Sequence, residues 1–257
     1  MSRLIDKLTK IRQIESQPMG FALGRVTSES PRMQLLAYLS SENVNKLFDS
    51  VSSADAILVE ITKSDSVATL EKLCRSKNGA PTGGWLKTSA SGTLKKALNI
   101  TCDFIIFPSD TELNVIPKEK VGRILVVEAS WSEGLLRTIN DLPVEAVLLA
   151  GSEAEATLTL NRLMLFQRLI YMVNKPVLVS TPANLTDTEL QALWDMGISG
   201  IVIQVSDDES AKGLSELHKY IERLAPPAFR KKNRASAILP RPSVEEPKTE
   251  ENEEEDE

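Results

Sequence analysis

The chain is poor in the residues that most often carry nucleophilic catalysis and zinc binding. Its 257 residues include one histidine, His218, and two cysteines, Cys74 and Cys102. A catalytic cysteine usually needs a nearby histidine as base, and His218 falls in the last predicted helix rather than at a strand end. Two cysteines in such different settings also do not suggest a disulfide framework. The sequence therefore argues against cysteine catalysis and predicts two reduced thiols.

Familiar catalytic, nucleotide-binding and metal-binding motifs are also missing from the sequence. It has no Walker motif, HExxH, GxSxG or GxGxxG, and no clustered Cys/His pattern. We therefore predict no metal, and the cofactor stays unknown.

Long apolar runs and a strong positive charge are absent as well. No run reaches the roughly 18 apolar residues that a membrane helix needs, and Lys7, Lys10 and Arg12 stand where a signal peptide would be apolar. The net charge is −6, with no clustered basic face of the kind that binds nucleic acid. We expect a cytoplasmic protein with no integral membrane segment and no nucleic-acid partner.

Half of that net charge comes from a tail rich in charge and proline. Residues 230–257 hold six basic and nine acidic side chains. Such a segment has too little apolar surface to offset chain entropy, so we predict disorder over 226–257. We favour a solubilising role for this tail; the alternative is that its apolar, proline-flanked stretch AILPRP at 237–242 binds a protein partner as an extended peptide.

Eight short apolar runs recur along the rest of the chain, and helix-like sequence follows most of them. Continuous Val/Ile/Leu runs suit parallel strands buried on both faces. The pattern predicts an α/β fold, a single (β/α)8 TIM-like barrel over 18–225. Glycines at 79–84 and Pro117 make irregularity around strands 3–5 an open alternative. The runs are 33–40, 54–61, 83–88, 102–107, 122–129, 145–151, 176–181 and 197–205.

Serine or threonine stands where several helices are expected to begin. Thr186, with Glu189 three residues later, fits a capping box, and Gly197 fits a left-handed residue after that helix. The other expected starts are Ser41, Ser66, Ser91 and Ser130.

An amphipathic helix precedes the barrel, within residues 1–17. Leu4, Leu8, Ile11 and Ile14 fall near one stripe of it. Such a helix could lie on a membrane, plug the N-terminal end of the barrel or pack on its side. We favour packing against the barrel, at its end or on its side, over the membrane position, because the stripe is aliphatic and lacks aromatic anchors.

Polar residues end most of the apolar runs. In a TIM barrel the C-terminal ends of the strands converge on one face, so these side chains could meet there. Lys87 is our candidate nucleophile or electrostatic group, and Glu60 and Glu128 are candidates for proton transfer. The candidate substrate-binding residues are Gln204, Ser180 and Ser109.

Each candidate has a purely structural alternative. Lys87 and the two glutamates could form an ion pair at the rim, or alternation along the strands could turn any of them toward the helices. Ser109 and Ser180 could instead cap the helices that follow them.

The stretch KPVLVSTPANLTDTELQALWDMGISGIVIQV at 175–205 resembles the late strand-helix-strand unit of aldolase-type TIM barrels. The resemblance implies a divergent member of that superfamily, with its site at the C-terminal ends of the strands. Phosphate- and flavin-binding members have paired glycines after the last strands. This chain lacks them and carries Asp207, Asp208 and Glu209 there. We therefore do not predict that it binds phosphate or flavin in the manner of those members.

Two functions follow as hypotheses. The first is an enzyme, lyase- or aldolase-like, that acts on a small polar metabolite at the barrel mouth. The second is a noncatalytic barrel that serves as a binding or assembly scaffold. The sequence leaves a homo-oligomer open in either case.

Overall fold

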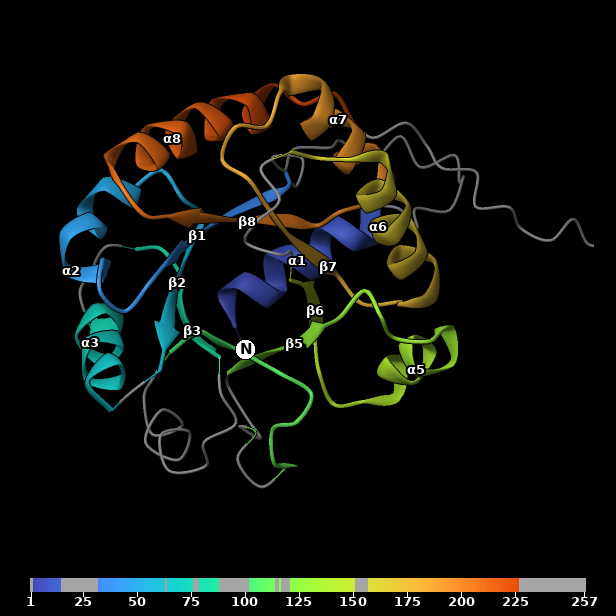
Figure 1. Cartoon of the computed structure of the whole chain (residues 1–257), viewed down its shortest axis with the longest axis horizontal. Helices are drawn as coiled ribbons and strands as arrows, with labels where there is room; N and C mark the ends of the chain where they lie inside the picture. Colours follow the sequence, from blue (N-terminus) through green and yellow to red (C-terminus); the bar gives the residue numbers. More distant parts are fainter. Residues whose placement is uncertain are drawn as a thin grey trace, which may run out of the picture.

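Eight parallel strands close into one barrel in a computed structural model of the chain, which describes residues 2–14, 32–62, 64–75, 79–87, 102–113, 116, 121–150 and 157–226. Each strand pairs with the next along the chain, and β8 pairs with β1 to complete the ring. Figure 1 shows the helices around this ring. The strands are β1 (Gln34–Leu39), β2 (Ala56–Ile61), β3 (Thr82–Leu86), β4 (Phe104–Phe107), β5 (Gly122–Val127), β6 (Ala146–Leu149), β7 (Val177–Thr181) and β8 (Gly200–Val205).

The predicted TIM-like barrel is confirmed: seven of the eight apolar runs contain one strand each, and β3 begins at Thr82, one residue before the run 83–88. β3 pairs regularly with β2 and β4 in spite of its glycines. Parts of the connections around strands 3–5, residues 88–101 and 117–120, lie outside the described residues, as does the tail from residue 227. The helices are α1 (Arg3–Ile14), α2 (Val44–Leu47), α3 (Ser64–Arg75), α5 (Glu133–Thr138), α6 (Leu160–Met172), α7 (Asp187–Met196) and α8 (Asp208–Arg223), with short 3-10 turns at Asp49–Val51 and Ile139–Asp141.

The helix starts are only partly as predicted. Thr186 forms the expected capping box with Glu189, and Gly197 is left-handed with φ 91°. Three other starts are wrong: Asn43 rather than Ser41 precedes α2, α3 begins at Ser64 and contains Ser66, and Ser132 rather than Ser130 caps α5. Before each of these three helices, several residues able to cap a helix lie within a few positions of each other. The path of the incoming chain decides which one takes the N-cap conformation. Ser91 lies outside the described residues.

The apolar side chains form two layers, one on each side of the strands. The outer layer packs between the strands and the surrounding helices and includes Leu70, Phe166 and Leu193. The inner layer fills the barrel itself, so the barrel is a packed core rather than a pore. It consists of Leu4, Ile5, Leu8, Leu36, Tyr38, Ala56, Leu58, Trp85, Phe104, Ile106, Ile124, Ala146, Leu148, Leu178 and Val202.

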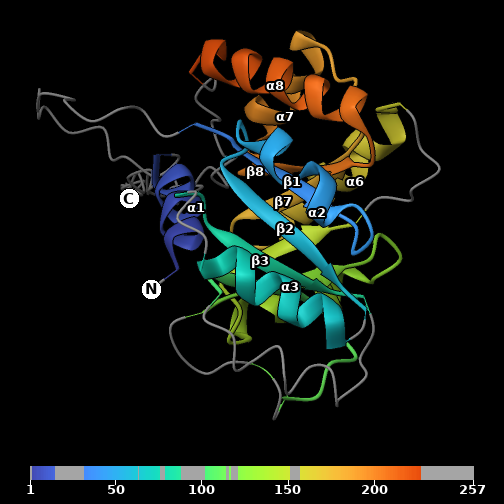
Figure 2. The same cartoon turned by 90° about the vertical axis from the view of Figure 1, so that its left-hand side faces the viewer.

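Helix α1 closes the N-terminal end of the barrel, as Figure 2 shows from the side. Its residues Leu4, Ile5 and Leu8 belong to the inner layer. The carboxylate of Asp103, just before β4, accepts hydrogen bonds from the Arg3 and Leu4 backbone N–H groups at 2.8 and 3.0 Å and so caps the helix. The expected packing of this helix is confirmed. Among the helices of the described residues, none is long and apolar enough to span a membrane.

The glycines of β3 make room for large neighbours. A Cβ atom added to Gly83 would lie 2.5 Å from the Phe104 carbonyl oxygen and 2.6 Å from its ring. One added to Gly84 would lie 2.4 Å from Ile61 Cδ1. A side chain at Gly83 would push on the β4 backbone and displace the barrel wall, whereas one at Gly84 would push the end of the buried Ile61 side chain aside.

We expect Gly83→Ala to lower the free energy of unfolding by about 1–3 kcal/mol, since overpacking forces the neighbouring strand to shift. Urea denaturation followed by circular dichroism measures the change. The matched control is Gly134→Ala in α5, where an added Cβ meets nothing within 4 Å. That substitution should leave stability unchanged or raise it slightly. Equal effects of the two alanines would contradict the steric explanation.

Candidate functional site at the barrel mouth

Alternation along the strands points most of the predicted site residues into the barrel. Inner-layer residues Leu58, Trp85 and Val202 each stand two positions before Glu60, Lys87 and Gln204, respectively. Because successive strand side chains alternate between faces, each polar residue has the same inward phase as its apolar neighbour. Ser180 follows Leu178 in the same way, and Glu128 follows Val126, which packs against the inner layer. The C-terminal ends of these strands therefore bear a polar ring above an apolar floor.

Two aromatic residues make up one side of this floor. The rings of Tyr38 in β1 and Trp85 in β3 lie with centroids 4.9 Å apart and planes inclined by 57°. Only 4% of Tyr38 and 6% of Trp85 is exposed. The Lys87 ammonium nitrogen lies over both rings, 4.2 Å from the Trp85 centroid and 5.3 Å from that of Tyr38. At such distances the negative face of each ring attracts the cation.

Two further polar residues stand beside these rings in the register of the sheet. Glu60 pairs with Trp85, and Gln204 pairs with Tyr38. The Glu60 carboxylate is half-buried and lies 3.5 Å from the Ser41 backbone N–H, which donates to it. Gln204 is exposed at the rim. The structure thus gathers Glu60, Lys87 and Gln204 around one aromatic pair.

The other three predicted residues lie elsewhere. Glu128, after β5, is two strands further round from β3; it is exposed and accepts a hydrogen bond from the Ser130 hydroxyl at 3.1 Å. Ser180 in β7 has the inward phase and is half-buried. Ser109 is exposed in a turn after β4, one position beyond Pro108, which has the inward phase. The Ser109 side chain therefore does not share the inward direction of the polar residues at the strand ends.

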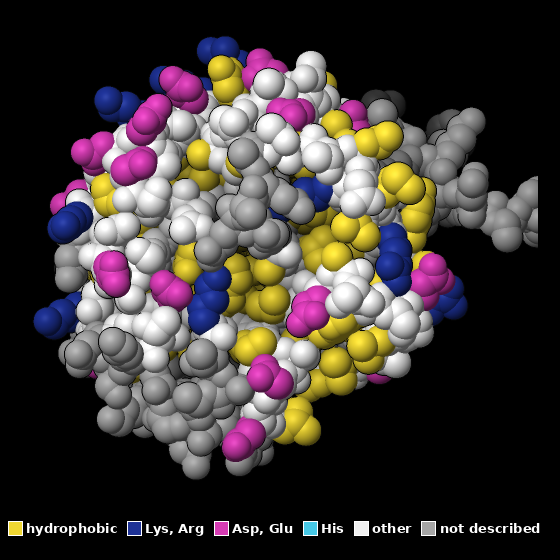
Figure 3. Space-filling view, in the orientation of Figure 1, with side chains coloured by type: hydrophobic (Ala, Val, Ile, Leu, Met, Phe, Trp, Pro, Cys, Tyr) yellow, Lys and Arg dark blue, Asp and Glu magenta, His cyan; other side chains and the backbone are white. Residues whose placement is uncertain are grey.

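Figure 3 views the molecule in the orientation of Figure 1 and shows this end of the barrel. Apolar side chains are visible over the centre, and acidic and basic side chains lie at their edges. A surface of this kind suits a small ligand with both an apolar part and a charged or polar group.

A buried arginine lies at the mouth and was not predicted from the sequence. Arg162 in α6 is 6% exposed, and its guanidinium donates to the Ser180 carbonyl at 2.5 Å and lies 5.7 Å from the Phe166 ring centroid. Buried arginine is uncommon unless paired, but its sequence position in a helix gave no sign of burial. The arginine holds the end of β7 in place.

Tyr38 and Trp85 were missed as well, although a signal was present. Trp85 and Lys87 are two residues apart, so a strand must place both on one face. The same rule gives Tyr38 the phase of Leu36. The polar strand ends alone do not indicate the aromatic residues beneath them.

The cysteines lie away from the mouth and are both free. Cys102 is buried just before β4, at the N-terminal end of that strand. Burial is the main reason that the pKa of Cys74 is raised to about 11 and that of Cys102 to about 12. Such thiols are protonated at neutral pH and are poor nucleophiles.

Within the described part of the chain, no group of three or more His, Cys, Asp or Glu side chains is placed to hold a metal ion.

Comparisons with known proteins place the fold. No protein-family model matches the chain, and no curated protein sequence matches it. A mutant tryptophan synthase alpha-subunit from the hyperthermophile Pyrococcus furiosus matches with a TM-score of 0.59 and 14% identity, over 75% of this chain and 99% of that one. KGPDC from Streptococcus mutans matches with a TM-score of 0.59 and 15% identity over the same shares.

At these identities the likeness concerns the fold alone. The resemblance of 175–205 to aldolase-type barrels is confirmed at that level. Together with the closed ring of eight parallel strands, these matches show that the chain has a TIM-barrel fold.

Proposed function

We propose that the barrel mouth binds a small polar metabolite and acts on it as a lyase or aldolase-like enzyme. The observation that carries this is the position of Lys87, whose ammonium lies 4.2 Å from the Trp85 ring centroid above a buried apolar floor. Active sites of TIM-barrel enzymes lie at this end of the strands. The solved structures with a similar fold include a tryptophan synthase alpha-subunit, which supports an enzyme-like use of the barrel.

Lys87 suits an electrostatic role in such chemistry. Its ammonium lies over two aromatic faces, whose ring quadrupoles attract a cation. In a carbon–carbon cleavage of the aldol type, negative charge develops on a carbonyl oxygen as the enolate forms. A positioned ammonium stabilises that charge.

The glutamates are then candidates for proton transfer. In the same cleavage a carboxylate removes the hydroxyl proton of the substrate as the carbon–carbon bond breaks. Glu60 stands beside Trp85 and is half-buried, which favours it over the exposed Glu128. Gln204 and Ser180 complete the set as substrate-binding residues. Ser109 is less well supported, because it lies one position beyond the inward-facing position of its strand.

The test begins with a thermal-shift screen of carbonyl and carboxylate metabolites against the full chain, followed by calorimetry. We expect Lys87→Met to weaken the binding of a hit about 10- to 100-fold, since a charge-assisted hydrogen bond contributes about 1.5–3 kcal/mol. The control is Lys7→Met, an exposed lysine on α1 at the other end of the barrel. Glu60→Gln should lower turnover more than affinity.

Unchanged ligand binding by the Lys87→Met variant would show that Lys87 does not take part in binding. Borohydride trapping with the same hits tests the nucleophile version separately: the amine adds to the carbonyl, water leaves, and reduction fixes the imine to the protein. Trapping on Lys87 would replace the electrostatic role with the covalent one.

The noncatalytic scaffold is the second candidate. It is favoured by the position of a large groove of about 460 Å³, which lies in the outer ring beside α7 and α8 rather than at the mouth. A screen that yields no hit dependent on Lys87, Glu60 or Gln204 would favour the scaffold.

A further inference from the structure

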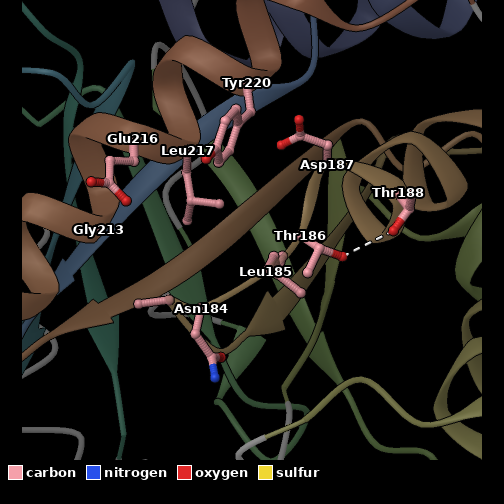
Figure 4. A pocket seen from close by; sticks show the side chains of 10 residues that line it. Asn184, Leu185, Thr186, Asp187, Thr188, Gly213, Glu216, Leu217 and Tyr220 are labelled. Carbon is pink, nitrogen blue, oxygen red and sulfur yellow. Dashed lines mark hydrogen bonds between the residues drawn. The ribbon is translucent and has the colours of Figure 1, made fainter.

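A groove in the outer ring combines an apolar base with two carboxylates. It lies between the loop after β7 and helix α8, with a volume of about 460 Å³. The lining includes buried Leu185 and Leu217, together with half-buried Tyr220, which give it an apolar base. Figure 4 shows Leu217 and Tyr220 pointing from α8 toward the loop that carries Leu185.

Two carboxylates, from Asp187 and Glu216, are the charged groups of this lining, which contains no basic side chain. Both residues are exposed. Within the described part of the chain neither carboxylate has a hydrogen bond or an ion pair, whereas the neighbouring Thr186 is fully engaged in its capping box. The groove therefore offers two carboxylates to an incoming cation.

The chain itself carries a suitable cation cluster a few residues beyond α8. Four of the five residues in RKKNR at 230–234 are basic, and Phe229 immediately precedes them. No other part of the tail combines an aromatic residue with clustered positive charge.

The tail also leaves the barrel next to the groove. The Ala225 backbone N–H donates to the Gln191 side chain at 3.0 Å, and the Gln191 amide donates back to the Ala225 carbonyl at 3.4 Å. Gln191 is four residues after Asp187 in α7, roughly 6 Å along the helix axis. Phe229 lies three residues beyond Pro226, a distance of up to about 10 Å when the chain is extended. The basic segment is thus within reach of the groove.

We propose that residues 229–234 dock intramolecularly in this groove, with Phe229 on the apolar base and the basic side chains beside Asp187 and Glu216. The contact ties the tail to the loop that follows Ser180 and Thr181 of β7. It is independent of the reaction at the mouth.

Trypsin cleavage of the full chain tests the docking, because the bound segment contains four potential cleavage sites. We expect Asp187→Asn/Glu216→Gln to raise the initial cleavage rate within 230–234 about three- to tenfold, the range that two exposed ion pairs support. Intact-mass spectrometry measures the rate. The matched control removes two exposed carboxylates of α5 and its 3-10 turn, Glu133→Gln/Asp141→Asn, and should leave the rate unchanged.

Salt provides a second measurement on the unaltered chain. Raising the ionic strength toward 1 M shortens the screening length to about 3 Å and should increase cleavage within 230–234 relative to cleavage at Lys248 in the same tail. Equal rates in the groove variant and the control would overturn the docking. Protection that grows with protein concentration and accompanies a dimer would also overturn it, because the groove would then hold the tail of a second copy.

Discussion

Replacing Leu8 by alanine is expected to lower the free energy of unfolding by about 2–5 kcal/mol. Leu8 lies on α1, is 0% exposed, and packs inside the barrel with Leu36 and Phe104. Alanine removes the buried apolar surface and leaves a cavity at the N-terminal end. Neighbouring strands are paired on both sides and cannot collapse to fill it.

Thermal and urea unfolding of the full chain measure this loss. A change of 2–5 kcal/mol corresponds to a fall in Tm of about 5–15 °C for a domain of this size. Lys10→Ala is the control, because Lys10 is exposed on the same helix and should change stability by less than about 0.5 kcal/mol. If Leu8→Ala behaved like the control, α1 would not be part of the barrel core.

Trp85→Ala is expected to affect both stability and the site. The side chain is 6% exposed, so its removal should lower the free energy of unfolding by about 3–5 kcal/mol. The same change removes the nearer of the two rings under the Lys87 ammonium, 4.2 Å away at its centroid. Lys87 then loses the nearer of its two aromatic contacts, and we expect the affinity for a mouth ligand to fall about tenfold.

Two companion variants separate the effects. Ile106 pairs with Trp85 in the sheet and is 0% exposed, so Ile106→Ala should destabilise by about 2–5 kcal/mol while leaving Lys87 on its rings. Trp85→Phe keeps an aromatic face and should preserve binding within about threefold. Calorimetry below the unfolding transition gives the affinities. Equal binding by Trp85→Ala and Ile106→Ala would show that the ring does not position Lys87.

The repeat of apolar runs was enough to predict the barrel, because strands buried on both faces need continuous apolar sequence and parallel pairing needs the helices between them. Even the weak run at 83–88 forms a strand. Its glycines, which count against strand structure in isolation, are required where Gly83 faces Phe104. Packing across strands overrides local propensity there.

Helix ends were predicted unevenly for a related reason. Thr186 had its Glu189 partner and Gly197 in the sequence, so the whole helix could be placed. Before α5, Ser130 and Ser132 are equivalent as residues. Only the fold shows that Ser132 caps the helix while Ser130 donates to Glu128.

The sequence by itself determined the eight strands, the packing helix at the N-terminus and the polar character of the strand ends, since all three depend on periodicity and composition. Only the tertiary structure decided how those ends are grouped. Glu60, Lys87 and Gln204 lie around the buried pair Tyr38 and Trp85, because strand register places them there. Glu128 follows β5, two strands from β3, and Ser109 lies one position beyond the inward-facing position after β4. Neighbours in a barrel are set by register and closure between distant segments, and a linear pattern of residues does not encode those distances directly.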